Sequence, residues 1–269
     1  MTDVPESTAP VALACEGLRY AFGETKAVDD LELTVRAGEV FGLLGPNGAG
    51  KTTAIRCITT LLPVPAGMVR VFGHDAAKER MAVRRLLGYV PQQLSADAGL
   101  TGRERAERVA RVLEAVDLTA AADRLAKTYS GGMIRRLELA QALVSAPRLL
   151  MLDEPTIGLD PIARTSVWEH INAVRAATGM TVLVTTHYMD EADQYCDRVA
   201  LMHRGRIHAL GTPHELRSEL AERRGAEGAA DPQPTLEDVF RDVAGSGLDE
   251  QGGDFRDVRS TRRTASRVG

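Results

Sequence analysis

One short run of residues constrains the fold of this chain more than any other part of its sequence. Residues 45–52 read GPNGAGKT, which matches the pattern GxxxxGK[ST] of a phosphate-binding loop. The continuous apolar run of residues 40–44 precedes it, and apolar residues at helical spacing follow it over residues 52–62. The sequence therefore predicts a strand buried on both faces, the loop, and a helix that Pro63 ends.

The residue types in this loop suit the binding of a nucleotide. Its glycines let backbone N–H groups turn inward around a phosphate at the positive end of the following helix. We expect Lys51 to place its charge on the β- and γ-phosphates and the hydroxyl of Thr52 to ligate Mg²⁺. The residues expected to bind the nucleotide here are Gly45, Pro46, Asn47, Gly48, Ala49, Gly50, Lys51, Thr52 and Thr53.

A second apolar run, residues 149–152, delivers two adjacent carboxylates, Asp153 and Glu154. Ligands bind at the carboxyl ends of the strands in doubly wound sheets, so both acids are expected in the site. Consecutive residues point in different directions. Asp153 can therefore hold Mg²⁺ through water, while Glu154 faces the attacking water as a general base.

The sequence Ser130-Gly131-Gly132 precedes a further helical pattern and is a second place where a helix N-terminus could bind an anion. Two such sites in one chain suggest that two copies share a nucleotide. An SGG sequence alone is a weak signal, because most are turns.

Composition excludes several classes of protein. With 33 Lys and Arg against 37 Asp and Glu, the net charge is −4, which argues against a nucleic-acid-binding protein. No run approaches the roughly 20 apolar residues that a membrane-spanning helix needs. The acidic start of the chain is unlike a secretory signal. Cys15, Cys57 and Cys196 are too far apart for a metal site, so we expect their side chains to be buried and the protein to work in a reducing cytoplasm.

Outside these motifs the sequence predicts strands over residues 11–15, 31–35 and 181–185, and helix over residues 103–125. Apolar spacing predicts a last helix, starting at Leu236 with Thr235 as its N-cap. The expected organisation is a flexible N-terminus (1–10), one catalytic unit (11–220), a linker with a short helix (221–255) and a disordered tail with five Arg (256–269).

The order of the motifs is specific. The phosphate loop, Gln92, SGG, the pair Asp153-Glu154, Asp160 and His187 together resemble the ATP-binding cassette of ABC transporters, from about Val11 to Leu216. The sequences YSGGM at 129–133 and PTLEDVF at 234–240 are similar to those of the daunorubicin-resistance type of drug-exporter ATPase.

This resemblance implies roles for single residues. Phe22, or Tyr20 in its place, would stack on adenine. Gln92 would contact Mg²⁺ and the attacking water, and His187 would hydrogen-bond the γ-phosphate. Ser130, Gly131 and Gly132 would contact the γ-phosphate bound by the opposite subunit, and Asp160 would lie across the dimer interface. The implied catalytic set is Glu154, His187, Gln92 and Lys51, and the implied metal set is Thr52, Gln92 and Asp153.

The resemblance implies an α/β P-loop NTPase cassette with a RecA-like core, a small antiparallel β subdomain and a helical subdomain over about residues 93–145. Its ligands would be ATP and Mg²⁺, and its partners a second copy, bound head to tail, and a membrane-spanning permease at the cytoplasmic face of the membrane. One departure is that only 27 residues separate Thr101 from Tyr129, which shortens the helical subdomain. We expect this to affect coupling to the permease rather than the ATP site.

Three other interpretations compete with an exporter. A soluble ABC-type ATPase acting on ribosomes or DNA usually has two cassettes or a long coiled-coil insertion, which this sequence lacks. A small-molecule P-loop kinase would not explain SGG, Asp160 and His187 together. An importer ATPase remains open, although such subunits often carry a large C-terminal regulatory domain, whereas only about fifty residues follow Glu219 here.

Overall fold

Strand β3 (Val40–Leu44), which precedes the phosphate loop, lies inside a six-stranded sheet. The computed structural model describes residues 9–90, 102–226 and 233–246. All five residues of β3 are buried, and the strand pairs in parallel with β8 (Thr181–Thr186) and β9 (Arg198–His203). The strand order is β10-β9-β3-β8-β7-β6. Beyond β8 lie β7 (Leu149–Asp153) and β6 (Leu87–Val90), both parallel, and β10 (Arg206–Gly211) pairs antiparallel with β9 at the opposite edge.

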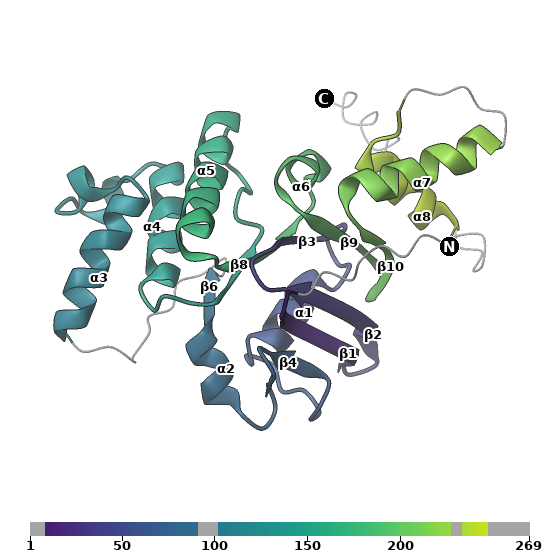
Figure 1. Ribbon diagram of the computed structural model, residues 1–269, viewed down its shortest axis with the longest axis horizontal. Coiled ribbons are helices and arrows are strands. Elements are labelled where there is room, and N and C mark those ends of the chain that lie inside the picture. Colours follow the sequence, from purple (N-terminus) through teal and green to yellow (C-terminus); the bar gives the residue numbers. More distant parts are fainter. Residues whose placement is uncertain (1–8, 91–101, 227–232, 247–269) are drawn as a thin grey trace, which may run out of the picture.

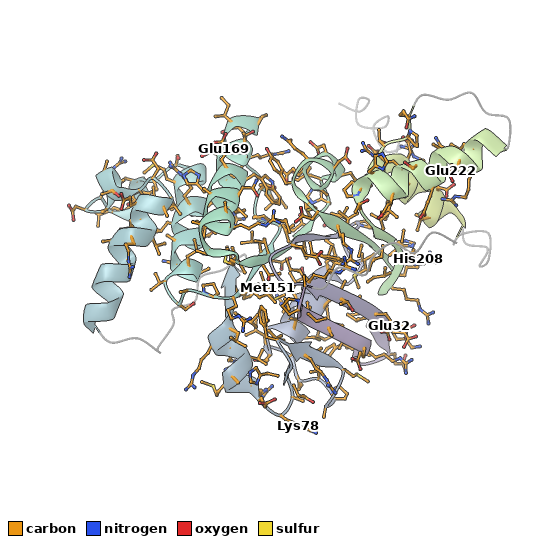
Figure 2. The ribbon with its side chains drawn as sticks, in the orientation of Figure 1. Glu32, Lys78, Met151, Glu169, His208 and Glu222 are labelled. Atoms are coloured by element: carbon orange, nitrogen blue, oxygen red, sulfur yellow. The ribbon has the colours of Figure 1, made fainter. Side chains whose placement is uncertain are left out.

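Side chains along the buried strands point alternately to the two faces of the sheet, so the hydrophobic core has two halves, one on each face. In β3, Phe41 and Leu43 pack on one side of the sheet, whereas Val40 and Leu44 pack on the other. Side chains of every second residue in a strand share a face, so one apolar run serves both halves. Met151 of β7 is fully buried in the first half, and Figure 2 shows it near the centre of the molecule.

The first half of the core is closed by a small antiparallel sheet and by α1 (Lys51–Ile58). The order of this sheet is β2-β1-β4-β5, from β1 (Val11–Phe22), β2 (Thr25–Arg36), β4 (Val69–Val71) and β5 (His74–Asp75). The two long strands exceed the predicted runs of residues 11–15 and 31–35. Irregular register between Cys15 and Leu18 breaks the alternation on which that prediction relied.

The second half of the core is covered by helices. Figure 1 shows α3 (Gly102–Ala115) and α4 (Gly131–Leu143) together at one end of the molecule, beside α5 (Pro161–Thr178). The predicted helix over residues 103–125 is wrong beyond Ala115. Asp117 has a left-handed backbone (φ 53°), and a 3₁₀ turn, η1 (Thr119–Ala121), lies in the second half of the predicted range, with another, η2 (Ala126–Thr128), directly after it.

Two helix ends also differ from expectation. Helix α1 ends at Ile58 instead of Leu62, because Thr60 has a left-handed backbone (φ 62°) that an α-helix cannot contain. Helix α7 (Pro213–Ala226) extends into the predicted linker, which therefore begins later than residue 221. The short helices α2 (Arg80–Leu86) and α6 (Met189–Tyr195) complete the core unit.

The last described helix, α8 (Leu236–Ser246), confirms the prediction made from apolar spacing. Its cap is reciprocal: the Asp238 N–H donates to Thr235 Oγ1 (3.2 Å), and the Thr235 N–H donates to the Asp238 carboxylate (2.9 Å). Leu236 and Val239 are buried against the helices of the second core half. The three cysteines are buried and free, as expected.

Within the residues that the structure describes, no helix combines the length and hydropathy that crossing a membrane requires. The predicted flexible N-terminus falls mostly, and the Arg-rich tail entirely, outside these residues.

Candidate nucleotide-binding site

The phosphate loop lies between β3 and α1, which confirms the predicted order of strand, loop and helix. Its conformation requires glycine at two positions. A Cβ atom at Gly50 (φ 105°) would lie 2.2 Å from the carbonyl oxygen of Ala27 in β2, and one at Gly45 would lie 2.2 Å from that of Met202 in β9. The loop is therefore held between backbones of both sheets. Pro46, Asn47 and Gly48 form its exposed top.

Lys51 is almost completely buried (5% exposed) at the first turn of α1. Its Nζ donates to the carbonyl oxygens of Gly45 (2.6 Å) and Pro46 (3.2 Å) and lies 3.2 Å from Glu154 Oε1. The ammonium group thus points into its own loop. The carboxylate of Glu154 balances its charge there.

Asp153 is the last residue of β7 and Glu154 follows it; both are buried, but their side chains have different partners. Asp153 Oδ1 accepts hydrogen bonds from Thr185 Oγ1 (2.6 Å) and Thr52 Oγ1 (3.3 Å). A buried carboxylate beside a hydroxyl group is a set of hard oxygen donors, which fits Mg²⁺ once phosphate oxygens complete the coordination. The structure therefore brings two residues of the predicted metal set together.

Sequence reasoning missed Thr185, which holds Asp153 in place. Thr185 lies on β8, opposite Asp153 in the pairing of β7 with β8. The available signal was a polar pair, Thr185 and Thr186, at the carboxyl end of an otherwise apolar strand. Strand order, which sequence did not supply, was needed to connect that pair with Asp153.

Glu154 links two of the other predicted catalytic residues. Its left-handed backbone (φ 52°) is stabilised by N–H donation to the carbonyl oxygen of Thr185 (3.1 Å), and it turns the side chain away from that of Asp153. While Oε1 pairs with Lys51, Oε2 lies 2.7 Å from Nδ1 of His187. Because a carboxylate only accepts, His187 donates from Nδ1 to Glu154. Lys51, Glu154 and His187 thus form one series, linked by an ion pair and a hydrogen bond.

Ser130, Gly131, Gly132 and Asp160 meet at a different place. Ser130 caps α4 by accepting from the N–H of Met133 (3.3 Å), and Asp160 caps α5 by accepting from that of Ala163 (2.9 Å). Both helix N-termini open into one cleft of about 510 Å³. No residue of the phosphate loop lines this cleft. Within one copy, the two predicted anion-binding elements are therefore separate.

Of the two aromatic candidates for adenine stacking, Phe22 is the more exposed. Phe22 is 52% exposed, whereas Tyr20 packs partly buried against the core with its ring edge-on to Phe22 (5.1 Å between centroids). The hairpin that carries both residues borders the phosphate loop through Ala27. Gln92 lies outside the described residues.

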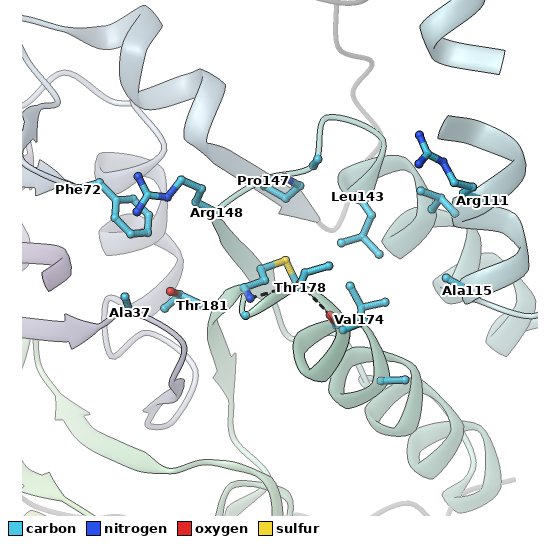
Figure 3. A pocket seen from close by; sticks show the side chains of 16 residues that line it. Ala37, Phe72, Arg111, Ala115, Leu143, Pro147, Arg148, Val174, Thr178 and Thr181 are labelled. Atoms are coloured by element: carbon cyan, nitrogen blue, oxygen red, sulfur yellow. Dashed lines mark hydrogen bonds between the residues drawn. The ribbon is translucent and has the colours of Figure 1, made fainter. Parts of the chain in front are cut away.

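A further cleft, of about 730 Å³, is drawn in Figure 3, and none of the predicted site residues lines it. It opens at the amino ends of β7 and β8, where Arg148 stacks on Phe72 (3.8 Å to the ring centroid). A cleft of about 690 Å³ does border the site, because it lies between the phosphate loop, His187 and residues Leu236 and Phe240 of α8. The sequence predicts helix α8 but not its position beside the phosphate loop.

Comparison with known proteins agrees with this geometry. The family model described as "ABC transporter" matches residues 28–157. The daunorubicin/doxorubicin resistance ATP-binding protein DrrA of Streptomyces peucetius is 48% identical over 224 residues, which cover 78% of this chain and 68% of that protein.

Two solved structures are also similar. An ATP-binding subunit of an ABC transporter has a TM-score of 0.72 and 26% identity over 87% of this chain and 99% of its own. A dimeric post-hydrolysis state of the cassette MJ0796, bound to ADP and Pi, shares the fold with a TM-score of 0.65 and 23% identity over 74% of this chain and 98% of its own.

Replacing Lys51 by alanine tests the phosphate loop. We expect Lys51→Ala to bind ATP about 10- to 100-fold more weakly, because a charge-assisted hydrogen bond contributes about 1.5–3 kcal/mol, and to show no measurable hydrolysis. Titration with labelled ATP and a phosphate-release assay measure both. Lys78→Ala, at an exposed lysine far from the loop (Figure 2), is the matched control and should behave like the parent. Hydrolysis by Lys51→Ala at the parental rate would contradict the assignment.

Proposed function

Since the chain belongs to the ATP-binding cassettes of ABC transporters and is an ATPase of that family, we propose that it is the ATP-hydrolysing subunit of an exporter of antibiotic-like compounds. One observation carries the catalytic part of this proposal: the carboxylate of Glu154 lies between Lys51 and His187 at the carboxyl end of β7. The 48% identity to a daunorubicin/doxorubicin resistance protein supports the export of a drug-like substrate.

The proposed role of Glu154 follows from its two partners. The carboxylate of Glu154 is shared between the ammonium group of Lys51 and the ring of His187. When the β- and γ-phosphates of ATP attract the ammonium group, Glu154 loses this ion pair and keeps His187. The carboxylate can then accept the proton of the attacking water. His187 orients the carboxylate, and its ring is the proposed hydrogen-bond partner of the γ-phosphate.

The oxygen donors at Thr52 and Asp153 are the proposed holders of Mg²⁺, with Gln92 as a third ligand. When bound, the ion would neutralise charge on the phosphate oxygens. Thr185 fixes the orientation of Asp153 by its 2.6 Å hydrogen bond. Phe22 is the proposed platform for adenine, because its ring is the exposed one.

We propose that two copies close head to tail over two nucleotides. The separation of the Ser130–Asp160 cleft from the phosphate loop supports this arrangement, since one copy cannot bring both to the same phosphate. The dimeric cassette of the same fold bound to ADP and Pi supports it as well. The γ-phosphate then bridges the two copies, and hydrolysis removes the bridge.

The proposed partner is a membrane-spanning permease, which would hold this chain at the cytoplasmic face of the membrane. The proposed cassette covers residues 11–220, and its helical subdomain, about residues 93–145, includes α3 and α4. In the part of this subdomain that the structure describes, α3 is the one α-helix before Ser130, and the proposed permease must fit it.

Glu154→Gln should bind ATP with nearly parental affinity but turn over about 10²–10⁴-fold more slowly, because it loses the carboxylate that accepts the proton. With the γ-phosphate retained, it should also persist as an ATP-bound dimer in gel filtration. The control Glu169→Gln, on the exposed face of α5, should hydrolyse ATP like the parent. Parental turnover by Glu154→Gln would show that another group is the base.

Mixing two inactive variants tests whether the motifs act between copies. Lys51→Ala and Ser130→Arg should each be inactive alone, but their heterodimer contains one site with an intact loop and an intact SGG. ATPase activity should therefore reappear in the mixture, at a fraction of the parental rate. Heterodimer formation is verified with two affinity tags. If tagged heterodimers form and stay inactive, the head-to-tail arrangement is wrong.

The membrane partner is tested by cell fractionation. Co-expression with the candidate permease should move the chain from the supernatant to the membrane pellet, and the association should survive high salt, which removes proteins held by lipid charge alone. Equal recovery in the pellet with and without the permease would exclude the permease as the anchor.

A further inference from the structure

Two segments that carry proposed catalytic residues are joined at three points. The first is the loop of residues 154–160, which leads from β7 to the N-cap of α5, and the second is the segment of residues 187–191, which begins α6. The points of contact among them and α5 are Glu154 with His187, Glu191 with both Thr156 and Trp168, and Arg164 with Tyr188. The first contact belongs to the catalytic series described above. The other two have no role in it.

Glu191 lies on α6 and is 5% exposed, among residues that are more deeply buried. Its Oε2 accepts from Thr156 Oγ1 (2.7 Å) and from Trp168 Nε1 (3.3 Å), and both of these residues are fully buried. One carboxylate oxygen of α6 therefore holds the loop and α5 at the same time. Burial raises the pKa of Glu191, while the hydrogen bonds from Thr156 and Trp168 act in the opposite direction.

The other oxygen, Oε1, is buried without a hydrogen-bond partner among the described residues. An unpaired buried carboxylate oxygen costs free energy, so packing alone does not favour glutamate over an apolar side chain of the same size. The gain that offsets this cost lies in the contacts of Oε2.

Arg164 holds the same loop from the other side. Its Nε donates to the carbonyl oxygen of Leu159 (3.0 Å), and its guanidinium lies 4.0 Å from the centroid of the Tyr188 ring. Leu159 precedes Asp160, and Tyr188 follows His187. The loop therefore cannot move relative to the start of α6 without breaking buried or half-buried contacts.

We propose that Glu191 is a positioning residue, which ties the loop that carries Asp160 to the helix that follows His187. This inference rests on the proposed function, in which Asp160 faces the second copy. Contact of the γ-phosphate with His187, which is bonded to Glu154, then fixes the position of Asp160 as well, because the two segments and the start of α5 move as one unit. The hydrogen bonds of Glu191 involve no residue of the phosphate loop, and Glu191 does not line the Ser130–Asp160 cleft.

The chain contains its own reporter of this unit. Trp168 is its only tryptophan, and it contacts α6 twice, through the hydrogen bond to Glu191 and by stacking on Tyr195 (4.7 Å between centroids, 11° between planes). Intrinsic tryptophan fluorescence, excited selectively, therefore reports the surroundings of Trp168 between α5 and α6.

The experiment compares Glu191→Leu with Glu191→Gln, each in the parent and in the Glu154→Gln background. The amide oxygen of glutamine can still accept from Thr156 and Trp168, whereas leucine cannot. We expect Glu191→Leu to lower kcat about 100-fold, the loss that a misplacement of about 1 Å can cause, with KM for ATP within about twofold of the parent. Glu191→Gln should stay within about threefold of the parent in both constants. Glu169→Leu, on the exposed face of α5 (Figure 2), is the control for an added leucine.

Two further measurements use the Glu154→Gln background. ATP should change the Trp168 fluorescence and produce a dimer in Glu154→Gln, and both responses should be lost when Glu191→Leu is added. Labelled-ATP binding should remain, because the phosphate loop is intact. Thr156→Val removes the donor from the opposite side of the contact. It should give the same fall in kcat without a rise in KM, and it serves as the deciding variant if Glu191→Leu does not fold.

The outcomes separate the inference from the proposed function. Parental kcat and ATP-dependent dimerisation in Glu191→Leu, or in Thr156→Val if the former is unfolded, would overturn the role of Glu191. A fall in kcat that accompanies an equal loss of ATP affinity and a lower Tm would mean a purely structural role and would overturn it too. If Glu154→Gln with an intact Glu191 forms no dimer with ATP, the proposed function fails instead.

Discussion

The ion pair between Lys51 and Glu154 is the interaction on which the rest of this site depends. Both side chains are less than one-tenth exposed, and they come from the helix after β3 and from the end of β7. A buried charge is tolerated only when its remaining hydrogen bonds are satisfied. The carbonyl oxygens of Gly45 and Pro46 do this for the ammonium group, and His187 does it for the carboxylate. The pair thereby joins the phosphate loop to the ends of two neighbouring strands.

Local patterns were sufficient to predict the parts of the structure that local interactions determine. The phosphate loop, the buried strands around Val40 and Leu149, and the cap at Thr235 follow from residue types within a few positions of one another. The end of α3 and the full length of the β1–β2 hairpin did not follow. Both depend on single residues with unusual backbone geometry or on breaks in register, which leave no apolar periodicity.

The parts of the site that could not be predicted share one property, which is that they depend on strand order. Thr185 becomes a partner of Asp153 only because β8 lies beside β7, and Glu191 reaches Thr156 across 35 positions of sequence. Nothing in a linear sequence distinguishes these polar residues from others on strand ends and short helices. By contrast, Asp153 and Glu154 can be identified from sequence, because they end an apolar run in a chain that also contains the phosphate loop.

The contact of the phosphate loop with both sheets has a consequence for the energetics of the whole chain. The carbonyl groups that shape the loop, those of Ala27 and Met202, come from the antiparallel sheet and from the parallel one. In the unfolded chain these groups are far apart, so the unfolded state has no nucleotide site. A ligand that binds only the native state raises the free energy of unfolding, by about 2.7 kcal/mol at a concentration 100-fold above its Kd. Nucleotide and native fold are thus thermodynamically linked through two glycines.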